Sequence, residues 1–161
     1  MLFRSAEKDS TVIRITAQQF AWNSRYPGKD GVFGRQNPKF VNANNAFGVD
    51  PSDPAAKDDV VPPLNEMAVP VNKPVIAYIT SMDVIHSFKI YPLRVNQDAT
   101  PGLRVPIHFV PTKEGKYQIV CAQLCGNSHY FMKGYFTVYS QKEYDEWLEK
   151  KSKSASAGSL E

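Results

Sequence analysis

Four side chains that bind soft metal ions lie within twelve residues of one another in the C-terminal part of the sequence. Cys121 and Cys125, the two cysteines of the chain, are followed by His129 and Met132. Thiolate, imidazole and thioether groups are the ligands that copper prefers. If His86 folds back onto this segment, the site gains a second imidazole. A mononuclear copper site uses a single thiolate, so the second cysteine indicates two metal ions that share bridging thiolates.

Simpler interpretations of the same residues exist. Cys121 and Cys125 could form a disulfide in a tight loop, although that would leave His129 and Met132 unexplained. Two cysteines and two histidines could hold a structural zinc ion, although the Cys-x3-Cys spacing is not that of a zinc knuckle and zinc does not use methionine. Met132 or His86 alone could be an ordinary core residue. The clustering of all of them favours a copper site.

Composition places the chain among ordinary globular proteins. Its 161 residues suffice for one domain with a sizeable core. The 12 prolines and 9 glycines favour a β-rich, loop-rich fold over a helical bundle. The formal net charge of +3 is too small to indicate nucleic-acid binding. No apolar run approaches the ~20 residues of a transmembrane helix.

Short segments rich in β-branched residues alternate with turn signals along most of the chain. The residues at 19–22 are expected to continue the first strand, and those at 141–151 to form one short C-terminal helix. The pattern predicts an all-β sandwich or barrel with Greek-key connections. The strands are expected at residues 11–17, 67–71, 75–81, 85–91, 104–110, 116–121 and 134–140.

Three segments are expected to lie outside this regular structure. Residues 28–65, rich in Gly, Pro, Asn and Asp, predict a long loop without helix or strand. Residues 152–161, rich in Ser, Ala and Gly, predict a disordered tail or linker. Residues 1–10 are expected to be a disordered or artificially added N-terminus. The folded domain is therefore expected to span residues 11–151.

Several longer stretches resemble the soluble CuA domain of subunit II of bacterial cytochrome c oxidase. The resemblance covers roughly residues 11 to 140. It is carried by Ser-Met-Asp-Val-Ile-His-Ser-Phe at 81–88, by Asp-Ala-Thr-Pro-Gly at 98–102, by Cys-Ala-Gln-Leu-Cys-Gly at 121–126 with the following His and Met, and by Phe-Ala-Trp with Tyr-Pro-Gly at 20–28.

The resemblance implies a cupredoxin-like Greek-key β-barrel or sandwich that holds two copper ions. In such a domain the copper centre accepts electrons from cytochrome c, or from a fused or associated c-type cytochrome, and passes them to a haem in subunit I. The domain then performs no bond-making chemistry of its own. The implied ligands are the bridging thiolates of Cys121 and Cys125, the imidazoles of His86 and His129, the thioether of Met132 and the backbone carbonyl of Gln123.

The resemblance also implies where the chain works. In the family, two transmembrane helices precede this domain, so the chain is expected to be a soluble fragment of a membrane-anchored protein, on the periplasmic side of the bacterial inner membrane. A copper chaperone or storage protein is the alternative from another class. Delivery sites of that class are usually exposed and use fewer ligands.

Two positions depart from the family pattern. The family usually has Glu where this chain has Gln123, and that carboxylate reaches a magnesium ion. A neutral amide is a poorer ligand for a hard cation, so the change bears on magnesium rather than on copper. Many members have a tryptophan where this chain has Phe20, and Trp22 is the nearest indole. Electron entry is therefore expected at Phe20 or at Trp22.

Overall fold

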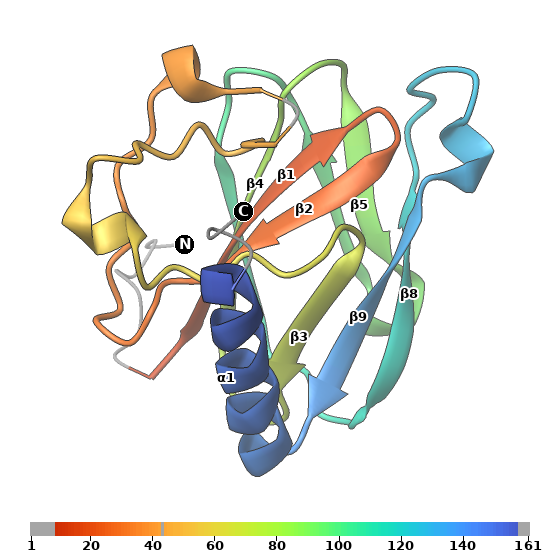
Figure 1. The fold of residues 1–161 in the computed structure, drawn as a ribbon. Coiled ribbons are helices and arrows are strands. Elements are labelled where there is room, and N and C mark those ends of the chain that lie inside the picture. Colours follow the sequence, from red (N-terminus) through yellow and green to blue (C-terminus); the bar gives the residue numbers. More distant parts are fainter. Residues whose placement is uncertain (1–8, 43, 158–161) are drawn as a thin grey trace.

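The computed structural model describes residues 9–42 and 44–157, which form two β-sheets and one C-terminal helix (Figure 1). The first sheet has the strand order β2-β1-β4-β7, with β1 Thr11–Gln18, β2 Ala21–Arg25, β4 Val75–Ser81 and β7 Val105–Phe109. The second sheet has the order β3-β9-β8-β5-β6, with β3 Glu66–Pro70, β5 His86–Ile90, β6 Val95–Ala99, β8 Gly115–Cys121 and β9 Lys133–Tyr139. The helix α1 is Gln141–Ala157.

The core lies between the two sheets and follows the two-residue period of the strands. Ile13 and Ile15 of β1 are fully buried, as are Val75 and Ile79 of β4. Successive side chains of a strand point to opposite faces, so Arg14 stands on the outer face of the same sheet. Two strand pairs, β1–β4 and β3–β9, are parallel, and the remaining pairs are antiparallel. The predicted all-β fold with one helix is confirmed as a two-sheet sandwich.

The strand predictions fail in two places. Residues 19–22 do not continue the first strand, because the chain turns at Gln19 and Phe20 and returns as β2. This turn is held from a distant segment: the Gln19 backbone N–H donates to Asp83 Oδ2 at 2.6 Å. The strand β6 was not predicted at all. Its central Asn, Gln and Asp have low strand propensity, and pairing with β5 at the edge of the sheet holds it in place.

The long segment at 28–65 contains no strand or α-helix among its described residues, as expected, but it is not without regular structure. It contains two 3-10 helices, Pro38–Phe40 and Pro54–Ala56, whose first turns are capped by the side chains of Asn37 and Asp53. Pro at the first helical position and an N-capping Asn or Asp favour such turns. Phe33 and Gln36 of this segment contact Arg14 on the outer face of the β2-β1-β4-β7 sheet.

The helix continues to residue 157, so the prediction of a disordered tail is wrong for residues 152–157. Residues 141–157 contain no Gly or Pro, and their Ala and Lys residues favour helix. Trp147 Nε1 donates to Glu66 Oε1 and Lys151 Nζ to Glu66 Oε2, both at 2.9 Å, which fixes α1 beside β3 (Figure 1). The predictions for residues 1–8 and 158–161 fall outside the described residues. No described helix is long and apolar enough to cross a membrane.

Candidate metal centre

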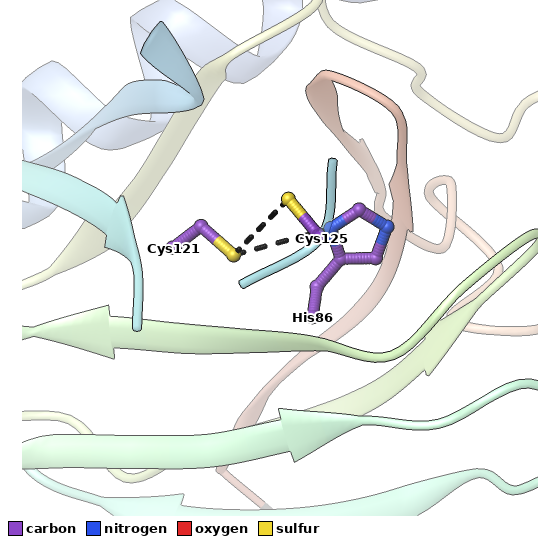
Figure 2. Close-up of side chains that lie close together, drawn as sticks. All are labelled: His86, Cys121 and Cys125. Carbon is purple, nitrogen blue, oxygen red and sulfur yellow. Dashed lines mark hydrogen bonds between the residues drawn. The ribbon is translucent and has the colours of Figure 1, made fainter. Parts of the chain in front are cut away.

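Two segments that are distant in sequence meet at one end of the second sheet. Cys121 is the last residue of β8, and Met132 immediately precedes β9, so the residues between them form the loop that joins these strands. His86 is the first residue of β5, which pairs with β8 through Phe88 and Cys121. This pairing brings His86 to the loop. Figure 2 shows the side chains of His86, Cys121 and Cys125 converging.

The two cysteine sulfurs lie at the middle of the cluster. Both are free thiols, and their Sγ atoms are 3.8 Å apart. This separation is well beyond a disulfide bond, so the structure does not contain the disulfide considered above. The Sγ of Cys121 lies 3.9 Å from Nδ1 of His86 and 3.1 Å from the backbone oxygen of Gln123.

The second sulfur has an equivalent pair of neighbours. The Sγ of Cys125 lies 3.5 Å from Nδ1 of His129 and 3.8 Å from Sδ of Met132. Each thiol therefore has within 4 Å one imidazole nitrogen and one weaker metal-binding atom. This atom is the carbonyl oxygen of Gln123 for Cys121 and the thioether sulfur of Met132 for Cys125. All six residues that the resemblance implied as ligands are brought together. This set of ligand atoms fits a soft metal ion such as copper.

The cluster is largely shielded from solvent. His86, Met132 and Cys125 are buried, whereas His129 is only partly exposed. Burial, and next the neighbouring thiol of Cys121, raise the pKa of Cys125 to about 12. At neutral pH this thiol is therefore protonated until a cation binds, because a metal ion must displace the proton to gain the thiolate.

Asp83 orients the imidazole of His86. Its Oδ1 lies 2.8 Å from Nε2 of His86. Partial burial raises the pKa of Asp83, but hydrogen bonds from His86 and from the backbone N–H groups of Gln19 and Val84 outweigh it and keep this pKa below its usual value. An ionised carboxylate beside Nε2 requires a proton on that nitrogen, which leaves the lone pair of Nδ1 facing the sulfurs. The sequence marked Asp83 only as part of a motif, without this role.

The turn between β1 and β2 joins both halves of the cluster. Gln19 donates from its backbone N–H to Asp83 and from Nε2 to the backbone oxygen of Cys125, both at 2.6 Å. Gly126, at φ 139°, lets the loop approach this turn: a Cβ there would lie 2.8 Å from Gln19 Nε2 and 3.0 Å from the ring of Phe20. No local sequence signal indicated that Gln19 contacts the loop.

The two aromatic residues considered for electron entry occupy different environments. Trp22 is fully buried and packs edge-on against Phe88 and His86, with ring centroids 5.3 and 6.2 Å apart. Phe20 is only partly buried and its ring lies against Gly126 of the loop. Of the two, only Phe20 reaches the surface beside the cluster.

Large apolar side chains are exposed on the same segments that carry the candidate ligands. Leu124 is 77% exposed, Tyr130 81% and Phe131 64%, and Val84 and Ile85 before His86 are exposed as well. Solvent-exposed apolar side chains that gather in one place mark contact surfaces in many proteins. These exposed apolar side chains flank the candidate ligands along the chain.

Comparisons with known proteins agree with this geometry. Residues 11–138 match the family model described as cytochrome c oxidase subunit II, periplasmic domain. The chain is 34% identical over 147 residues to the alternative cytochrome c oxidase subunit 2 of Bradyrhizobium diazoefficiens, covering 91% of this chain and 53% of the relative. It is 31% identical over 156 residues to cytochrome c oxidase subunit 2 of Cereibacter sphaeroides, covering 89% and 50%.

A solved structure gives the same result for the fold. The crystal structure of the periplasmic domain of subunit II of cytochrome oxidase of Bradyrhizobium japonicum superposes with a TM-score of 0.67 at 31% identity, covering 93% of this chain and 99% of that one. The predicted cupredoxin-like fold is confirmed. The chain spans about half the length of the two curated relatives.

Proposed function

The chain belongs to the cytochrome c oxidase subunit II family, whose periplasmic domain it contains, and on this basis we propose that it transfers electrons through a centre of two copper ions. One observation carries the proposal: two free thiols 3.8 Å apart, each with an imidazole Nδ1 and a weaker donor beside it. Copper in such a sulfur-rich site exchanges electrons, and two ions that share bridging thiolates can share one electron between them.

The protein's own residues prepare the site for this role. The six proposed ligands are His86, Cys121, Gln123 through its carbonyl, Cys125, His129 and Met132. Asp83 accepts a hydrogen bond from the imidazole of His86, and Gln19 donates one to the backbone oxygen of Cys125. Burial keeps water from the sulfurs. A donor set that is already assembled needs little rearrangement when an electron arrives, which favours fast transfer.

The proposed partners are those of the family. Electrons would arrive from cytochrome c or another c-type cytochrome and leave to the haem of subunit I, with the domain on the periplasmic side of the inner membrane. The exposed Leu124, Tyr130 and Phe131 supply an apolar contact surface beside the ligands. We place electron entry at Phe20 rather than at Trp22, because Trp22 is fully buried. The neutral side chain of Gln123 offers no carboxylate to a magnesium ion.

Copper stoichiometry and electron paramagnetic resonance together test the proposal. The chain loaded with copper is expected to hold two ions and one unpaired electron, whose hyperfine pattern has more lines than a single copper nucleus can give. A copper chaperone or storage protein would bind copper without such a shared electron. A spectrum typical of one isolated copper ion, or a ratio of one, would reject the dinuclear centre.

Replacing Asp83 with alanine is expected to weaken copper binding about 10- to 100-fold, the usual effect of losing the partner of a metal-bound histidine. The imidazole of His86 would lose the acceptor that holds the proton on Nε2. Competition with a chelator measures the change. Asp145→Ala, an exposed carboxylate on α1, is the matched control and should leave the affinity unchanged. Equal affinities in the two variants would contradict the orienting role.

Copper binding is expected to strengthen as the pH rises. The pKa of Cys125, raised to about 12, keeps its proton in place at neutral pH. Low pH therefore favours the protonated thiol, and high pH favours the metal. Each proton that copper displaces makes the apparent affinity rise about tenfold per pH unit. Chelator competition between about pH 6 and pH 8 measures the slope. An affinity independent of pH would contradict proton displacement.

A further inference from the structure

A second cluster, remote in the fold from the thiols, lies on the outer face of the β2-β1-β4-β7 sheet. There two arginine side chains donate to a single neutral oxygen: Arg14 Nη1 lies 2.8 Å from Gln36 Oε1, and Arg104 Nη2 lies 2.7 Å from the same atom. Gln36 is held in this orientation by its own Nε2, which donates to the backbone oxygen of Phe47 at 2.9 Å.

The two guanidinium groups carry positive charge that no carboxylate offsets directly. Among the described residues, neither Arg14 nor Arg104 forms an ion pair. Asp59, an acid near Arg14, is bound to Arg25 and to the backbone N–H of Gly34. Burial, and next the positive charges of Arg104 and Arg25, lower the pKa of Arg14 to about 10. The cluster therefore favours an added negative charge.

The same side chains line an open cavity of about 390 Å³. The ring of Phe33 lies beneath Arg14, with the guanidinium carbon 4.1 Å from the ring centroid, and fixes the plane of that group. Tyr78 is the neighbour of Arg14 in the paired strand β4 and adds a hydroxyl group. The full lining is Val12, Arg14, Gly31, Phe33, Tyr78 and Arg104.

We propose that this cavity binds the tetrahedral oxyanion of a phosphate group between Arg14 and Arg104. Each guanidinium uses one nitrogen on Gln36, which leaves further N–H groups for a ligand. The planar guanidinium groups, one from β1 and one from the residue before β7, suit the several oxygens of a phosphate. Arginine binds phosphate through paired hydrogen bonds. A free phosphate and a phospholipid headgroup offer the same chemistry.

Calorimetric titration of the full chain with inorganic phosphate, against chloride of equal ionic strength, tests the proposal. One phosphate is expected to bind per chain. Arg104→Gln should weaken binding about tenfold or more, because a charged hydrogen-bonding group is lost. Arg35→Gln is the matched control: this exposed arginine already faces Asp50 and Asp53, so its loss should change nothing. Equal weakening by both variants would overturn the site.

A second variant tests the site by adding a negative charge instead of removing a positive one. Gln36→Glu places a carboxylate oxygen where Oε1 now lies between the two guanidinium groups. This internal anion should abolish phosphate binding, and circular dichroism checks that the variant folds. Phosphate binding that persists in this variant would contradict the proposed position of the ligand.

Vesicles distinguish the source of the phosphate group. The full chain is mixed with vesicles of phosphatidylcholine, with and without phosphatidylglycerol. Binding to the anionic vesicles that is lost in Arg104→Gln identifies a lipid headgroup, whereas binding of inorganic phosphate alone identifies a free anion. Both results support the site. If neither inorganic phosphate nor anionic vesicles bind through Arg104, the proposal is wrong.

Discussion

Replacing Cys125 with serine is expected to destroy the proposed two-copper centre while the fold remains. The Sγ of Cys125 has Cys121, His129 and Met132 as its neighbours. Its loss removes one of the two sulfurs that are proposed to bridge the metal ions. A serine hydroxyl is similar in size but stays protonated and binds soft copper poorly. The copper-to-protein ratio should fall from two to one or less, and the shared-electron spectrum should disappear.

A control variant in the same loop separates this effect from general damage. Asn127 is exposed and is not a proposed ligand, so Asn127→Ser should keep both copper ions and the spectrum. Circular dichroism of the metal-free variants checks that both fold. If Cys125→Ser retained two ions and an unchanged spectrum, a bridging role for this thiol would be excluded, and with it the dinuclear proposal.

The largest effect on stability is expected from Asp59→Asn. Arg25 of β2 is 0% exposed and Asp59 of the long loop is 3% exposed, and they form a buried ion pair. The guanidinium cannot release its proton in a protein, so removing the carboxylate leaves a buried charge without its counterion. Breaking one side of such a pair costs about 3–5 kcal/mol. Urea unfolding of the metal-free chain measures this loss.

Two further variants test the cause of that loss. Arg25→Met combined with Asp59→Leu removes both charges and should recover much of the stability, because no charge is then left buried. Arg35→Met breaks ion pairs whose arginine is 71% exposed, and should cost at most about 1 kcal/mol. An Asp59→Asn variant no less stable than Arg35→Met would show that the buried pair contributes little.

The proposed ligands could be identified from the sequence because most of them lie within one short loop. Cys121, Cys125, His129 and Met132 reveal their chemistry by type and spacing alone. The strands at either side were also predictable, since β-branched residues and turn signals are local features. These parts of the molecule depend on nearby residues.

The parts that could not be predicted depend on distant residues. Gln19 contacts Asp83 across 64 positions and Cys125 across 106, and neither contact leaves a trace in the local pattern. Strand β6 has the composition of a loop and becomes a strand only by pairing with β5. The ion pair between Arg25 and Asp59 could not be predicted either, because the two residues are 34 positions apart in the sequence.

The turn at Gln19 has a consequence for protein engineering. A chimaera that receives only the loop at 121–132 would gain both thiols, His129 and Met132, but not His86 or the hydrogen bonds that Asp83 and Gln19 provide. A recipient β-sandwich must therefore supply an equivalent hairpin and an adjacent strand with its own histidine. The transplantable unit is three spatially adjacent segments rather than one contiguous peptide.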